Sequence, residues 1–161
     1  MNNELRKKEI WNFTYRGIAC EIVHWGIDKN SEYFRNGTWN GYLYINRKQL
    51  PRDFRKLLCK ENKYKGFGNR KHWDYYKVDK YFDFHGEITY YELLLDEFTG
   101  KSTGIKVGDD YAHSFDSGMT YDENDIKRNL EKCVDAFIKN FPNYKIWDGK
   151  DGKYKTPNKV N

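Results

Sequence analysis

Apolar and polar residues alternate over positions 11–25, on either side of the pair Arg16-Gly17. A period of two is typical of a half-buried strand, and a glycine between two such runs is typical of a tight turn. The pattern therefore predicts a β-hairpin. His24 falls on its apolar face beside Ile22, and a single histidine in such a place is usually a core residue.

The segment 38–46 predicts another strand. Leu43 and Ile45 lie on one of its faces, and Tyr42 and Tyr44 lie on the other. Bulky side chains on both faces are typical of a strand that is central in its sheet or covered on both sides. We therefore expect this strand to be central in its sheet or covered on both faces.

The segment 81–95 predicts one strand, or two strands separated by a bulge at Gly86. Alternation along it would bring four polar side chains to one face: Asp83, His85, Glu87 and Thr89. The turn-forming residues 99–104 then lead into a returning strand that runs from Ile105 towards Asp110. We therefore expect the acidic residues of 109–116 to lie along the sheet from Thr89 and near His85.

The most regular periodicity lies in the last third of the chain. Apolar residues recur at spacings of three and four over 122–141, which is typical of an amphipathic helix. Thr120-Tyr121-Asp122-Glu123 fits a capping box, with Asp122 as another possible cap, and Pro142 ends the helix. A second, short helix is predicted near 51–59, because a proline suits the first turn.

Together these elements predict an α+β fold. A mainly antiparallel sheet of about five or six strands would be packed on one face by the helix 122–141. A length of 161 residues suits a single domain, which we place at 1–147. The Gly- and Lys-rich residues 148–161 predict a loosely ordered tail.

Charge is unevenly spread along the chain. The formal net charge is +5, but the segment 47–71 holds ten Lys or Arg and only two acidic residues, so it carries +8 and the remainder −3. Aromatic residues make up 18% of the chain, and several follow this basic segment closely. Basic and aromatic residues together suit a phosphate-bearing partner, nucleic acid included, while a solvated basic face is the alternative interpretation.

The glycine-rich stretch within 60–71 is not a Walker phosphate loop, because no GKS or GKT follows it. It could close over an anion as a lid, or it could be an ordinary connection. Cys20, Cys59 and Cys133 are widely spaced and favour reduced thiols over disulfides or a structural zinc site. The first ten residues lack the apolar core of a signal peptide, and no apolar run approaches the roughly 20 residues of a membrane span. We expect a cytoplasmic protein without membrane attachment, metal or cofactor.

Two polar clusters are the candidates for a functional site. One surrounds His85, and the other contains Asp110, His113 and Asp116. The clusters could fix the polar groups of a ligand, while basic and aromatic residues supply charge and stacking. The predicted ligand-binding residues are His85, Thr89, Asp110, His113, Asp116, Arg70, Lys71 and Trp73. The alternative is that these residues stabilise turns through local hydrogen bonds.

Catalysis is a second possibility for the same residues. His85 and His113 could serve as acid and base, with Asp110 or Asp116 orienting an imidazole. Phosphodiesterase-like cleavage would suit this pair, but Thr89 lies four residues after His85, unlike the spacing of two-histidine phosphoesterases. A metal-dependent version would use both histidines and both aspartates. We favour binding over catalysis.

Two short segments resemble the motifs of a known family. His85-Gly86-Glu87-Ile88-Thr89-Tyr90 is similar to H-G-G-[I/L]-T-[Y/F], and Gly108-Asp109-Asp110-Tyr111-Ala112-His113-Ser114-Phe115-Asp116 is similar to G-F-D-x-A-H-x-x-D. These motifs belong to a largely uncharacterised family of small proteins of bacteriophages and other mobile elements. The sequence departs from the motifs at Glu87, which replaces a glycine, and at Asp109, which replaces an aromatic residue.

The resemblance implies a phage-type accessory protein, and small proteins of this kind often act against host defence. One hypothesis is that it sequesters an anionic, nucleotide-like immune signal in a basic and aromatic pocket. A second is a protein that inhibits a host immune effector by binding it, as an anti-CRISPR protein does. A His-dependent hydrolase is the third. The positive net charge argues against an acidic DNA mimic.

Overall fold

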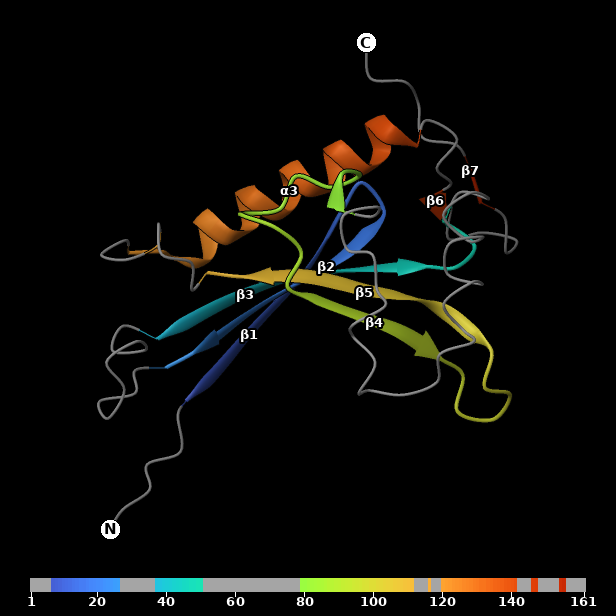
Figure 1. Cartoon of the computed structure of the whole chain (residues 1–161), viewed down its shortest axis with the longest axis horizontal. Helices are drawn as coiled ribbons and strands as arrows, with labels where there is room; N and C mark the ends of the chain where they lie inside the picture. Colours follow the sequence, from blue (N-terminus) through green and yellow to red (C-terminus); the bar gives the residue numbers. More distant parts are fainter. Residues whose placement is uncertain are drawn as a thin grey trace.

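In the computed structural model, the described residues are 7–26, 37–50, 79–111, 116, 120–141, 146–147 and 154–155. They form an antiparallel five-stranded sheet with one long helix across it, so the predicted α+β class is confirmed (Figure 1). The strand order is β1-β2-β3-β5-β4. Within the described part of the chain, no helix combines the length and the apolar character needed to cross a membrane.

The predicted hairpin is present as β1 (Lys8–Tyr15) and β2 (Ile18–Trp25). Arg16 and Gly17 form its turn, with φ angles of 49° and 82°. A two-residue turn with both φ angles positive matches the right-handed twist of the flanking strands, which explains the glycine. Tyr15 therefore pairs with Ile18, and this register places alternate residues of β2 in the core.

The strand β3 (Thr38–Asn46) lies between β2 and β5 (Ser102–Asp110), so the prediction of an internal strand is confirmed. The edge strand β4 (Tyr90–Leu95) pairs with β5 as the predicted hairpin, but the turn lies at 96–101, earlier than the predicted 99–104. Asp96 holds this turn, because its side chain accepts hydrogen bonds from the backbone N–H groups of Phe98 and Thr99. The pairing of β4 with β5 ends at Tyr90, opposite Gly108.

The predicted strand over 81–89 is wrong. This segment runs from Asp79 to Thr89 as turns and bends, and Gly86 has a φ of 86°. Asp79 forms hydrogen bonds with the backbone of this segment. The Asp79 carboxylate accepts from the N–H of Ile88, and the Asp79 carbonyl accepts from the N–H of Phe82. The segment therefore has no strand face on which Asp83, His85, Glu87 and Thr89 could be aligned.

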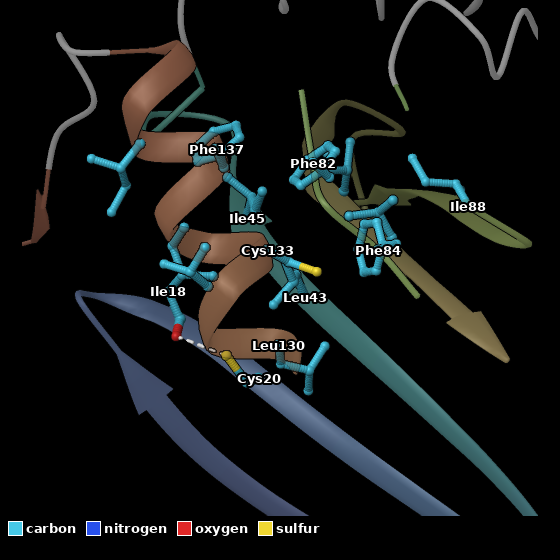
Figure 2. Close-up of a cluster of buried hydrophobic side chains, with 14 of the residues drawn as sticks. Ile18, Cys20, Leu43, Ile45, Phe82, Phe84, Ile88, Leu130, Cys133 and Phe137 are labelled. Carbon is cyan, nitrogen blue, oxygen red and sulfur yellow. Dashed lines mark hydrogen bonds between the residues drawn. The ribbon is translucent and has the colours of Figure 1, made fainter. Parts of the chain in front are cut away.

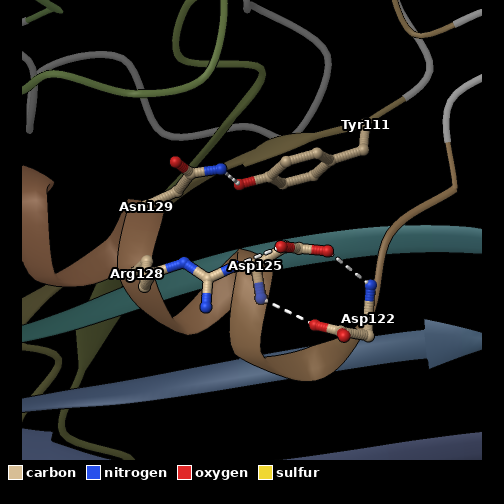
Figure 3. Close-up of polar contacts among 5 residues, drawn as sticks. All are labelled: Tyr111, Asp122, Asp125, Arg128 and Asn129. Atoms are coloured by element: carbon tan, nitrogen blue, oxygen red, sulfur yellow. Dashed lines mark hydrogen bonds and ion pairs between the residues drawn. The ribbon is translucent and has the colours of Figure 1, made fainter.

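The helix α3 (Glu123–Asn140) confirms the predicted C-terminal helix. Its N-cap is Asp122, which forms a reciprocal capping box with Asp125 (Figure 3). The box predicted from Thr120 to Glu123 is therefore wrong in register, whereas the alternative cap at Asp122 is confirmed. An aspartate at N3 can reach back to the N-cap N–H in the same way as the more usual glutamate.

The core lies between α3, the sheet and the 79–89 segment (Figure 2). Leu130, Cys133 and Phe137 of α3 face Leu43 and Ile45 of β3 in this view. The helix packs closely against β3 at Gly41, where an added Cβ would lie 3.0 Å from the side chain of Leu130. The buried side chains of the 79–89 segment close the core on another side: Phe82, Phe84 and Ile88.

Ile146–Trp147 forms β6, which pairs with β7 (Tyr154–Lys155) in a separate two-stranded sheet. Ile146 and Trp147 therefore add no edge strand to the five-stranded sheet. The short helix near 51–59 and the loop 60–71 lie outside the described residues, as does most of the tail 148–161.

Candidate functional site

His85 and Asp116 form a close side-chain pair in which Nε2 lies 2.5 Å from Oδ1. The histidine comes from the 79–89 segment and the aspartate follows β5, so the pair joins the two motifs found in the sequence. The Asp116 side chain is only 4% exposed, whereas that of His85 is 19% exposed. A buried carboxylate thus holds an imidazole that reaches the surface. We call this pair the His85–Asp116 dyad.

Tyr121 is the second donor to the same carboxylate, with its hydroxyl 2.5 Å from Asp116 Oδ1. It directly precedes the N-cap of α3, so the helix start positions this hydroxyl. Burial, followed by the hydrogen bond to Asp116 and its charge, raises the pKa of Tyr121 to about 12. The phenol is therefore a neutral donor at ordinary pH.

Tyr111 forms an aromatic wall beside the dyad. Its ring stacks on the His85 imidazole, with centroids 4.3 Å apart and planes 9° apart, and it meets Tyr121 edge-on. The Tyr111 hydroxyl accepts a hydrogen bond from Asn129 of α3 at 3.0 Å (Figure 3). Burial is the main cause that raises the pKa of Tyr111. The helix therefore holds the dyad through two tyrosines, one at its start and one through its second turn.

Asp109 lies next to this cluster and is 1% exposed. Burial raises its pKa well above the ordinary value, and the charges of Asp110 and Asp116 add to the effect. The backbone N–H of His85 opposes the shift, yet neither carboxylate oxygen makes a hydrogen bond within the described structure. A neutral acid is the form that this environment favours.

Asp110 and Thr89 are brought together, as predicted from the hairpin register. The backbone N–H of Asp110 donates to the Thr89 hydroxyl at 3.0 Å. However, alternation along β5 places the Asp110 side chain on the face opposite to α3, where its charge acts on Tyr42. Asp110 and the dyad therefore lie on different faces of the sheet. The Thr89 hydroxyl accepts a backbone hydrogen bond and is not part of the dyad.

Four of the predicted ligand-binding residues lie outside the described residues: Arg70, Lys71, Trp73 and His113. Among the predicted residues that the structure describes, it joins His85 with Asp116, and Thr89 with Asp110. Sequence reasoning missed Tyr111, Tyr121 and Asn129. A usable signal existed for Asp109, because it shares strand parity with the apolar residues Ile105 and Val107.

A different cluster occupies the sheet face opposite to α3. The ammonium group of Lys106 lies over the rings of Tyr42, Tyr44 and Tyr90, at 4.2 to 5.4 Å from their centroids, and 3.3 Å from a Glu21 oxygen. Tyr42 reaches this place because its register partner is Gly108, where an added Cβ would lie 2.5 Å from its ring. These contacts compensate the lysine charge internally through cation–π and ion-pair interactions.

A carboxylate–imidazole pair can orient the ring, stabilise its protonated form and support hydrogen bonding to a ligand or proton transfer. Among the described residues, no group of three or more His, Cys, Asp or Glu is arranged to hold a metal ion. Comparison with known proteins found no matching family model, no matching curated protein and no matching solved structure. The phage-family resemblance therefore rests on its two motifs alone.

Proposed function

We propose that the protein binds a small nucleotide-type ligand at the His85–Asp116 dyad. The observation that carries this proposal is the 2.5 Å contact between a buried aspartate and a partly exposed histidine whose ring is stacked on Tyr111. Such an arrangement fixes the ring before any ligand arrives, and this lowers the entropic cost of binding. The partly exposed imidazole could also form a hydrogen bond with a nucleoside.

The distribution of charge suggests that the nucleoside and the phosphates of the proposed ligand bind at different places. The dyad contains the carboxyl group of Asp116 and lies near that of Asp109, and carboxyl groups suit hydroxyl and amino donors better than phosphates. The phosphates would need the cations of the segment 47–71, including Arg70 and Lys71, and Trp73 would add a stacking surface. We therefore propose that the nucleoside part binds at the dyad and that the phosphates bind the basic segment, of which residues 51–71 lie outside the described residues.

The wider role that we propose is counter-defence in a host cytoplasm, with the ligand acting as a nucleotide-like immune signal. This step is supported only by the motif resemblance to phage proteins. Inhibition of a host protein by direct binding is the alternative. Phe98 favours that alternative, because its side chain is 96% exposed at the tip of the β4–β5 hairpin, and exposed aromatics often anchor protein interfaces.

The dyad also supports a second candidate function. Asp116 could orient His85 as an acid–base group in a phosphodiesterase-like reaction, because a carboxylate hydrogen-bonded to an imidazole stabilises the imidazolium that forms on proton uptake. His113 would be the second histidine of such a reaction. Binding and catalysis differ in one observable, which is whether the ligand leaves the protein intact.

The test is a ligand-release experiment with a panel of cyclic oligonucleotides and ADP-ribose derivatives. The protein is incubated with each compound, separated from free ligand and heat-denatured, and the supernatant is analysed by mass spectrometry. Intact nucleotide supports binding, and a cleaved product supports the hydrolase. No retained or altered compound would contradict both for that panel.

A matched variant pair makes this test specific to the site. His85→Ala should abolish retention, whereas His24→Ala should leave it unchanged. The two side chains are equally exposed, at 19%, but His24 stacks on Trp39 of β3 instead of meeting the dyad. Equal loss in both variants would indicate a general effect on folding and would count against the site.

A further inference from the structure

Asp109 places a carboxyl group in the protein interior. It is 1% exposed, and neither oxygen has a hydrogen-bond partner among the described residues. Buried polar groups are nearly always hydrogen-bonded, and a buried carboxylate without a partner is strongly unfavourable. This group therefore calls for a physical explanation.

The position of Asp109 connects the sheet to the helix. It follows Ile105 and Val107 on the face of β5 that is buried under α3. Its register partner is Gly41, and the space without a side chain there is filled by Leu130 of the helix. Asp109 thus lies opposite a position of β3 against which α3 packs closely.

Charged and titratable groups reach Asp109 from each of the surrounding segments. Asp110 from β5 and Asp116 from the dyad both disfavour its ionisation, while the backbone N–H of His85 favours it. Burial raises the pKa of the Cys133 thiol on α3 and of Tyr111 after β5, and the charge of Asp109 adds to both shifts. Burial is the largest cause of the raised pKa of Asp109 itself.

We propose that Asp109 is a proton-dependent latch between β5 and α3, and that loss of its proton loosens the helix and the tyrosines that hold the His85–Asp116 dyad. The path is short. Tyr111 is hydrogen-bonded to Asn129 of α3, and Tyr121 precedes the helix cap while holding Asp116. The latch is a property of the fold, and its role in regulating the site rests on the proposed function.

The latch has a defined dependence on pH. An unfolded aspartate loses its proton near pH 4, whereas folded Asp109 keeps its proton to a higher pH. Between these values the folded state binds one more proton, so stability falls as pH rises. The unfolding equilibrium constant should increase by up to about tenfold per pH unit over that interval. The stabilisation from protonated Asp109 is complete only below the pKa that this group has in the unfolded chain.

The first test compares the pH dependence of urea unfolding in the wild type, Asp109→Asn and Asp110→Asn. Asp109→Asn should lose the tenfold-per-unit component, because its side chain cannot ionise. Asp110→Asn removes the same charge one residue away, on the other face of the sheet, and should retain the component. Parallel pH profiles for the wild type and Asp109→Asn would overturn the proposal.

A second measurement uses only the wild-type protein, in case Asp109→Asn does not fold. The carbon-13 shift of the Asp109 carboxyl group should titrate well above the ordinary value of about 3.9, and a transition at that value would overturn the latch. Amide exchange should show whether the N-terminal half of α3 opens as Asp109 ionises. Helix protection that does not follow this titration would overturn the link to the dyad.

All of these experiments are done without ligand. Their failure would therefore leave the proposed nucleotide binding standing, and a negative ligand-release experiment would leave the latch standing.

Discussion

The imidazole of His85 and the carboxylate of Asp116 lie 2.5 Å apart although 31 residues separate them in the chain. Each belongs to one of the two motifs that stand out in the sequence, and the fold makes one site of them. Two tyrosines support the contact, because Tyr121 donates to Asp116 and Tyr111 stacks on His85. Four predictions test this arrangement and the fold that supports it.

Asp116→Asn should destabilise the protein by about 1.5–3 kcal/mol, the range for hydrogen bonds to a charged group. The substitution weakens the acceptor of both His85 and Tyr121 in a buried place. Urea unfolding at neutral pH measures the change. Asp135→Asn is the control, because Asp135 pairs with Arg16 but its side chain is 48% exposed. Exposed pairs contribute at most about 1 kcal/mol, so equal losses in the two variants would contradict a special role for Asp116.

The contribution of Tyr121 to the stability of the protein should be lost at alkaline pH. Its pKa is raised from 10.0 to about 12 in the folded protein, so its contribution to stability is complete below about pH 10 and is lost as the pH rises towards 12. Wild-type protein should therefore lose more stability than Tyr121→Phe over this interval. Phenolate absorbance, compared between the two proteins, isolates the Tyr121 transition. A Tyr121 transition near its ordinary pKa would show that the contact with Asp116 is not maintained in solution.

The sequence allowed the N-cap of α3 to be either Thr120 or Asp122, and substitutions distinguish the two positions. Asp122→Ala should cost about 0.5–2 kcal/mol, because it removes the side chain that accepts from the N–H of Asp125. Thr120→Ala should cost less than about 0.5 kcal/mol, because Thr120 is exposed and lies outside the cap. Thermal unfolding followed by circular dichroism compares them, and the reverse order would place the helix start at Thr120.

Two glycines should differ in their tolerance of alanine. At Gly41 the new Cβ would meet the side chain of Leu130 at 3.0 Å, and partial repacking should limit the cost to about 1–3 kcal/mol. At Gly108 it would lie 2.2 Å from the backbone oxygen of Gly41, which cannot move without disturbing the β3–β5 pairing. Gly108→Ala should therefore be the more destabilising substitution. A smaller effect than that of Gly41→Ala in chemical unfolding would contradict the close approach of these strands.

The local elements were predictable because their periodicities reflect burial directly. The hairpin around Arg16-Gly17, the internal strand β3 and the helix α3 all follow the expected alternation or helical spacing. The segment 79–89 was not predictable in this way. Its aromatic residues look strand-like, but Asp79 satisfies part of its backbone and its buried side chains close the core.

The sequence by itself therefore determined the α+β class, the main strands and the helix, and it pointed to His85 and Asp116 as candidate site residues. Strand parity also separates Asp109 from Asp110. Only the tertiary structure decided that His85 meets Asp116, that Tyr111 and Tyr121 support them and that Asp109 has no partner among the described residues. Local patterns record which side of an element is buried, whereas contacts between distant segments depend on how the helix, the sheet and the 79–89 segment pack together.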